Sequence, residues 1–137
     1  EYYQSTDGLA RPGDNSSTNI GLRGWWRPES TGTATPSISV GYDTSETDAT
    51  GNSNTTAYFV GLNWQDIINA DDRIGIAFGQ PQKHEDDTVD PFLYEVYYDY
   101  KINDSVTVTP TIFGGTSNEG GTEVDMTGYL VNTTFKF

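Results

Sequence analysis

The sequence predicts an all-β protein, an antiparallel transmembrane β-barrel of which about seven or eight strands lie within the 137 residues. Apolar and polar residues alternate with a period of two, the pattern of strands whose two sides meet different environments. One face of each alternating segment, counted in the last segment from Tyr129 onward, carries no Asp, Glu, Lys or Arg. Tyr and Trp gather at the segment ends on that face, as in the interfacial girdles of membrane barrels. Together these three observations favour strands that face lipid on one side.

Seven segments carry the alternation, and clusters of Gly, Asn, Asp, Ser, Thr and Pro separate them. The segments cover residues 18–27, 36–43, 56–65, 73–79, 92–101 and 105–113, and a last strand that starts near Glu123 and ends at Phe137. Before them, a stub at residues 1–4 leads into a polar stretch up to Ser17. Its content of Gly, Pro, Asp and Asn predicts a loop.

Each segment has a distinct apolar face. In the first four segments this face holds Ile20, Leu22, Gly24 and Trp26, then Ile38, Val40 and Tyr42, then Tyr58, Val60, Leu62 and Trp64, then Ile74, Ile76 and Phe78. In the last three it holds Phe92, Tyr94, Val96, Tyr98 and Tyr100, then Val106, Val108 and Ile112, then Tyr129, Val131, Thr133, Phe135 and Phe137. Pro110 interrupts the sixth segment, and a proline inside a central strand loses a ladder hydrogen bond. We therefore expect a bulge or the strand end at Pro110.

The overall composition resembles that of a soluble acidic protein, with a net charge of −13 and a mean hydropathy of −0.60. Membrane barrels are compatible with such values, because only every second strand residue meets lipid. No run approaches the roughly 18 apolar residues of a membrane-spanning helix. The absence of cysteine is compatible with an extracytoplasmic location but does not require one.

The connections are expected to alternate in length. Residues 66–72 and 101–104 are short, whereas residues 44–55, 80–91 and 114–122 are longer. Membrane barrels have short periplasmic turns and longer external loops. If Phe137 ends on the periplasmic side, strand parity places the three longer connections outside.

Six strings, in their order and spacing, carry a resemblance to a known family. They are GWWRP at 24–28, PSISVGY at 36–42, VGLNWQD at 60–66, GIAFGQP at 75–81, YEVYY at 94–98 and VTVTP at 106–110. From about Gly21 to Phe137 the chain resembles the C-terminal half of cyanobacterial outer-membrane porins of the OprB type, the carbohydrate-selective group often labelled iron-uptake porins. None of the strings is a catalytic signature.

The resemblance implies a barrel of about 16 strands, a monomer or homotrimer in the outer membrane of a Gram-negative, cyanobacterial cell. Residues 1–137 would be the C-terminal part of a single porin domain, without the upstream strands, S-layer-homology domain and signal peptide. Such a barrel passes sugars, inorganic ions and iron passively and needs no cofactor. Its partners would be outer-membrane lipid, the β-barrel assembly machinery and small solutes.

Two sets of residues are candidates for these roles. The pore-lining candidates are Arg23, Arg27, Arg73, Glu95, Asp99, Lys101 and Lys136, whose charges would set up a field that selects polar solutes. They are equally interpretable as solvated residues or as ion pairs that stiffen the wall. The insertion signal would be Tyr129, Val131, Phe135 and Phe137. Trp25 and Phe113, on the polar face, would either stack against sugar rings or fill the wall.

Other interpretations stay open. A soluble extracellular β-sandwich would also alternate apolar and polar residues. In that protein an acidic loop with His84, Glu85, Asp86, Asp87 and Asp90 would hold calcium, although its spacing matches no loop motif and a solvated loop explains it as well. A third possibility is a small closed barrel, complete in itself.

Catalysis is not expected. A single histidine and no cysteine leave little nucleophile-and-base chemistry. No glycine-rich phosphate cradle follows a strand, and we predict no metal or cofactor site. A pI near 4.1 argues against nucleic acid as a partner.

Overall fold

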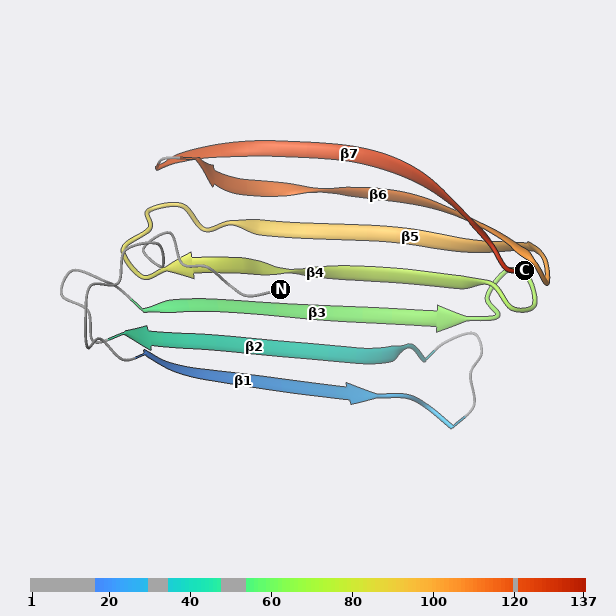
Figure 1. The fold of residues 1–137 in the computed structure, drawn as a ribbon, viewed down its shortest axis with the longest axis horizontal. Coiled ribbons are helices and arrows are strands. Elements are labelled where there is room, and N and C mark those ends of the chain that lie inside the picture. Colours follow the sequence, from blue (N-terminus) through green and yellow to red (C-terminus); the bar gives the residue numbers. More distant parts are fainter. Residues whose placement is uncertain (1–16, 30–34, 48–53, 120) are drawn as a thin grey trace.

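The computed structural model describes residues 17–29, 35–47, 54–119 and 121–137, which form one antiparallel sheet (Figure 1). The strands are β1 (Ser17–Trp26), β2 (Ser37–Thr47), β3 (Thr55–Gln65), β4 (Arg73–His84), β5 (Phe92–Asn103), β6 (Val106–Glu119) and β7 (Thr122–Phe135). Each strand pairs with the next one along the chain, so the sheet is a seven-stranded meander. The predictions of an all-β fold and of seven strands are confirmed. None of the described residues belongs to a helix long and apolar enough to cross a membrane.

The two ends of the sheet carry different connections. The end where Phe137 lies, called here the C-terminal end, has the connections 27–36, 66–72 and 104–105 (Figure 1). The opposite end has the connections 48–54, 85–91 and 120–121. The predicted alternation in length is therefore wrong, because residues 114–119 continue β6 and residues from Thr122 belong to β7. These residues are polar on both sides, so alternation could not reveal their pairing with each other.

The strand register brings the apolar positions together on one side of the sheet. One row of paired residues crosses all seven strands and consists of Trp26, Ile38, Leu62, Ile76, Val96, Ile112 and Tyr129. The row one residue away consists of Trp25, Ser39, Gly61, Ala77, Glu95, Phe113 and Gly128. We call the side with the first row the apolar face and the side with the second row the polar face. A single slip in register would exchange the two faces.

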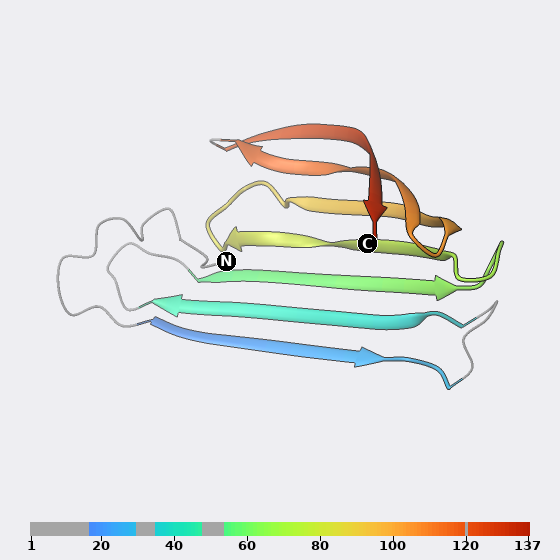
Figure 2. The same cartoon turned by 45° about the vertical axis from the view of Figure 1, so that its right-hand side comes forward.

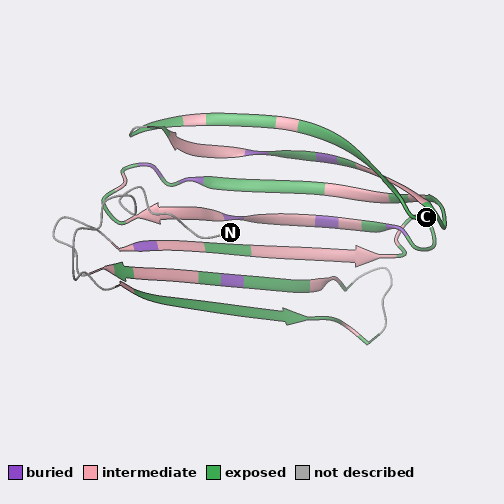
Figure 3. Cartoon of the chain, viewed as in Figure 1, coloured by how far each residue is buried: buried purple, intermediate pink, exposed green. Residues whose placement is uncertain are grey.

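The sheet has almost no interior. Among the described residues, Val89 is the only buried hydrophobic side chain; β1 and β7 are mostly exposed, and β3 and β4 are mostly of intermediate exposure (Figure 3). On the apolar face Tyr129 is 86% exposed, and Leu22 and Val131 are also largely uncovered. A soluble sheet normally buries one such face against a second layer. The described part of the chain supplies no second layer.

The sheet is curved but not closed. β6 and β7 bend away from the plane of β1 to β4, most strongly near the C-terminal end (Figure 2). β1 and β7 are the two edges and do not pair with each other. Because neighbours are antiparallel throughout, β1 and β7 run in the same direction.

Two prolines lie within strands. Pro81 lies at an irregularity where β4 has more residues than the facing part of β3, between the pairs Tyr58–Gln80 and Thr56–Lys83. Pro110 lies inside β6 opposite Val131, in regular register with β7. The expected bulge or strand end at Pro110 is therefore wrong. On its other side, β6 has no residue paired with β5 between Thr111 and Val108. Pro110 lies in this gap, so the N–H group that proline lacks is not needed for a pair there.

Candidate functional site on the polar face

The polar face brings most of the predicted pore residues onto one surface. Arg23, Arg73, Glu95, Asp99 and Lys101 lie on β1, β4 and β5, whereas Arg27 and Lys136 directly follow β1 and β7. In the register, Arg73 lies opposite Asp99, and Lys101 lies opposite Thr107. The Thr109 hydroxyl donates a 2.7 Å hydrogen bond to the Asp99 carboxylate. Alternation alone had already placed these charges on one side.

Several of the basic side chains are held by neighbours. Nη2 of Arg23 lies 2.8 Å from Oδ2 of Asp43, and its Cζ lies 5.6 Å from the ring centroid of Phe59. Nζ of Lys101 lies 2.9 Å from Asp71 and 3.1 Å from Asp104. These contacts favour the ion-pair interpretation for Arg23 and Lys101.

Two further candidates, Arg27 and Glu95, form no ion pair with another described residue. Arg27 donates a 3.0 Å hydrogen bond to Oε1 of Gln65, which links the end of β1 to β3. Within the described residues, the carboxylate of Glu95 has neither a hydrogen bond nor an ion pair. Its cross-strand neighbours are Ala77 on β4 and Phe113 on β6. Glu95 is thus an exposed carboxylate between apolar side chains.

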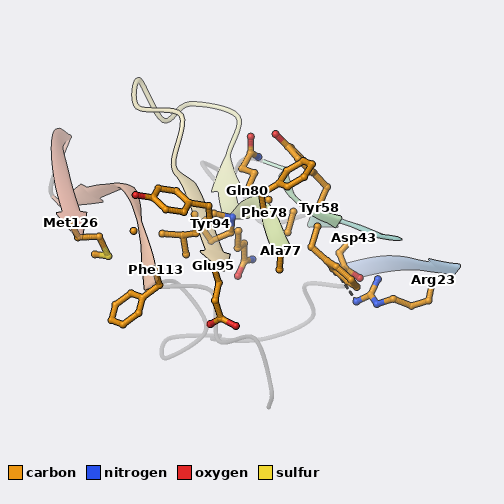
Figure 4. Close-up of a pocket in the computed structure, with 17 residues that line it drawn as sticks. Arg23, Asp43, Tyr58, Ala77, Phe78, Gln80, Tyr94, Glu95, Phe113 and Met126 are labelled. Carbon is orange, nitrogen blue, oxygen red and sulfur yellow. Dashed lines mark hydrogen bonds and ion pairs between the residues drawn. The ribbon is translucent and has the colours of Figure 1, made fainter. Parts of the chain in front are cut away.

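Glu95 lines a hollow of about 530 Å³, together with residues from both faces of the sheet (Figure 4). Its lining residues on the polar face include Arg23, Asp43, Ala57, Phe59, Ala77, Leu93, Glu95, Phe113 and Met126. Figure 4 shows Glu95 and Phe113 on one side of the strands and Tyr58 and Gln80 on the other. The wall of the hollow is mostly apolar, with charge confined to the Arg23–Asp43 pair and Glu95.

Three aromatic rings on the polar face lie across glycines of the neighbouring strand. A β-carbon on Gly41 would overlap the ring of Phe59, one on Gly75 would overlap Tyr97, and one on Gly128 would overlap Phe113. Tyr97 also accepts a 2.7 Å hydrogen bond from Nδ2 of Asn63. Sequence reasoning singled out Phe113 but missed Phe59 and Tyr97. The available signal was a glycine at the facing position, which only the register identifies.

The other aromatic candidate on this face behaves differently. Trp25 lies on β1, the edge strand, and is 80% exposed. Its register partner is Ser39, so no glycine receives the indole ring there. Trp25 therefore does not line the hollow that Phe113 lines, although the sequence predicts the same role for the two residues.

The β3–β4 turn holds a buried carboxylate that sequence reasoning missed. Asp72 is 1% exposed and accepts backbone hydrogen bonds from Ile67 at 2.9 Å, Ile68 at 3.0 Å and Asn69 at 2.7 Å. The hydroxyl of Tyr98 on β5 donates a fourth, at 2.9 Å. Burial on its own would raise the pKa of Asp72, but these four hydrogen bonds outweigh it and hold the pKa below its usual value.

Asp72→Asn is expected to lower the unfolding temperature at neutral pH, because an amide cannot accept all four hydrogen bonds as a carboxylate does. Since the folded pKa is depressed, the carboxylate stabilises the protein above the unfolded pKa of about 3.9 and loses this effect as the pH falls through the folded pKa. Unfolding of the detergent-solubilised protein should show a clear difference from wild type at pH 7 that shrinks below pH 4. Asp104→Asn, on an exposed turn carboxylate, is the matched control. Equal unfolding temperatures for the two variants at pH 7 would contradict the role of Asp72.

The remaining candidates lie on or just after the edge strand β7 and at the end of the sheet opposite Phe137. Tyr129, Val131 and Phe135 lie on the apolar face of β7, and Phe137 follows that strand. At the opposite end Lys83 forms an ion pair with Asp90, and Asp87 accepts a hydrogen bond from the amide of His84. No group of three His, Cys, Asp or Glu side chains within the described ranges is arranged to hold a metal ion.

The fold and the polar face define a class of structure, an open antiparallel meander with one apolar and one polar face. Comparisons with known proteins found no family model, no curated protein and no solved structure that matches the chain.

Proposed function

We propose that the chain forms part of the wall of an outer-membrane β-barrel, a porin that passes small hydrophilic solutes passively. In this proposal the apolar face meets lipid and the polar face lines water. The observation that carries the proposal is the oblique path of the apolar band across the sheet. Such a path is what a planar membrane produces on tilted strands.

The band can be followed through the register. On β1 its residues run from Ile20 to Trp26, and on β7 they run from Tyr129 to Phe135. Trp26 and Tyr129 lie in the same row, yet Trp26 is the last apolar residue toward the C-terminal end and Tyr129 is the first. From β1 to β7 the band thus moves six residues toward the C-terminal end of the sheet, over six steps between neighbouring strands. This shift equals the length of the band on one edge strand. With a rise of about 3.3 Å per residue and a strand spacing of about 4.8 Å, this shift corresponds to about 35°.

That angle supports a membrane because strands in transmembrane barrels tilt by about 35–45° from the membrane normal. A soluble sandwich has no plane that requires its apolar residues to move by one residue per strand. On the border toward the C-terminal end, the aromatic residues Trp26, Trp64, Tyr100 and Phe135 follow the same slope. On the opposite border Tyr42, Tyr58 and Phe92 lie in one row, and Tyr129 lies four residues nearer the C-terminal end. Aromatic residues at both borders are typical of the interfacial girdles of membrane barrels.

Strand parity supports a larger barrel. β1 and β7 run in the same direction, so pairing them directly would create a parallel ladder. Closure by antiparallel pairing alone needs an odd number of further strands between them. Aqueous channels belong to barrels of about 16 strands, whereas about eight leave an interior filled by side chains. The seven strands therefore form a consecutive section of the wall of a pore.

The test uses the full-length protein and two neighbouring positions on β4. A spin label on Ile76→Cys, on the apolar face, should collide with oxygen in the lipid phase. A label on Ala77→Cys, the next residue on the polar face, should collide with a water-soluble nickel complex. The same protein should give stepwise conductance in a planar bilayer and migrate differently on detergent gels before and after heating. A water-soluble full-length protein with no conductance and no difference between the two labels would favour the β-sandwich alternative.

A further inference from the structure

The hollow around Glu95 has an uneven distribution of charge. Three charged groups line it, namely Arg23, Asp43 and Glu95. The guanidinium of Arg23 is satisfied by Asp43 at 2.8 Å and lies against the ring of Phe59. The negative charge of Glu95 therefore remains without a partner among the described residues.

The cross-strand neighbours of Glu95 are apolar. Phe113 and Ala77 are its direct neighbours on the two adjacent strands, and side chains directly opposite each other in an antiparallel pair lie about 5 Å apart at Cβ. Leu93 precedes Glu95 on the same face of β5 and lines the same hollow. A small inorganic ion would gain nothing from these walls. An organic group that carries a positive charge would gain both from them and from the carboxylate.

We propose that this hollow binds an organic cation, a primary ammonium group on a small apolar body. The ammonium would donate hydrogen bonds to the Glu95 carboxylate, and the body would pack on Phe113 and Leu93. The ring of Phe113 extends over Gly128 of β7 and is 39% exposed, so it offers an apolar surface to such a body. A volume of about 530 Å³ is within the range of small-molecule sites, roughly 300–1,000 Å³. The inference rests on the proposed channel, through which the cation would reach the hollow.

The experiment measures block of the single-channel current of the full-length protein in potassium chloride by phenethylammonium. Its neutral analogue 2-phenylethanol serves as the uncharged probe. In Glu95→Gln the concentration for half block should rise about tenfold, the effect of losing a charge-assisted hydrogen bond. In Phe113→Leu it should rise by a smaller factor, because the apolar contact is partly kept. Glu123→Gln, which changes a carboxylate on β7 outside the hollow, should leave it unchanged.

The outcomes separate the two proposals. Equal block of wild type and Glu95→Gln, or equal block by the amine and by 2-phenylethanol, would overturn the cation site while leaving the channel intact. If no channel forms, the proposed function fails, and calorimetric titration of the detergent-refolded full-length protein with phenethylammonium decides the site. Wild-type affinity about tenfold above that of Glu95→Gln would still support the hollow as a cation site. Equal affinities would overturn it.

Discussion

Spin labels at Ile38 and Tyr129 are expected to lie at different depths in the bilayer, although both residues belong to the same register row. Ile38 is at the border of the apolar band toward the C-terminal end, and Tyr129 is at the opposite border. They are five strands apart, so a strand tilt of about 35° separates them by about 14 Å along the membrane normal. This is about half the thickness of the hydrocarbon core. A nickel complex added to only one side of the bilayer would measure the separation of labels at Ile38→Cys and Tyr129→Cys, because a reagent present on both sides reports only the distance to the nearer surface.

The same row supplies the control. Leu62, Ile76, Val96 and Ile112 lie between the two labelled positions, and depth should change steadily from one to the next. Ile112 and Tyr129, which are direct neighbours, should differ by only about 3 Å. Equal depths along the row would mean that the membrane plane is perpendicular to the strands. That result would remove the principal support for a tilted barrel wall.

Gly115→Ala is expected to be the most damaging small substitution among the strand glycines. Gly115 has a φ of 144°, a conformation that side-chain-bearing residues rarely adopt. A β-carbon there would overlap the carbonyl oxygen of Phe92 and lie 2.8 Å from Cα of Leu93, so β5 and β6 would have to separate. The backbone conformation alone costs about 1–3 kcal/mol. Urea unfolding in detergent, followed by tryptophan fluorescence, should show at least this loss in the free energy of unfolding.

Gly61→Ala is the matched control on β3. Its nearest neighbours would be Cβ and the carbonyl oxygen of Ser39, at 3.8 and 4.0 Å, which are ordinary contacts. We expect its free energy of unfolding to stay within about 0.5 kcal/mol of wild type. A comparable loss in both variants would mean that the close approach of Phe92 to Gly115 does not limit stability.

The strand positions and the separation of the two faces could be predicted from the sequence, because alternation is a local signal. Five of the seven charged pore candidates lie on strands, on the face where alternation had placed them, with Arg27 and Lys136 just beyond β1 and β7. The ends of β4 and β6 could not be predicted. Residues such as Thr116 and Asn118 are polar and face polar neighbours, so only pairing with another strand identifies them as part of the sheet. Loop length was misjudged for the same reason.

The candidate site depended more strongly on tertiary structure. Glu95 was recognisable as a charged residue on the polar face, but its lack of an ion-pair partner and its position in a hollow depend on what β1, β4 and β6 place around it. Asp72 looked like one acidic turn residue among several. Its burial and its hydrogen bond from Tyr98 require the turn to fold against β5.

By itself, the sequence determined that this chain is a set of two-faced strands, since side chains alternate along a strand whatever its neighbours are. Only the tertiary structure decided how those strands are aligned. Register is a property of pairs far apart in the chain, and it set the slope of the apolar band, the placement of Phe59 over Gly41, and the neighbours of Glu95. The two faces are thus encoded locally, whereas the tilt and the hollow arise from non-local pairing.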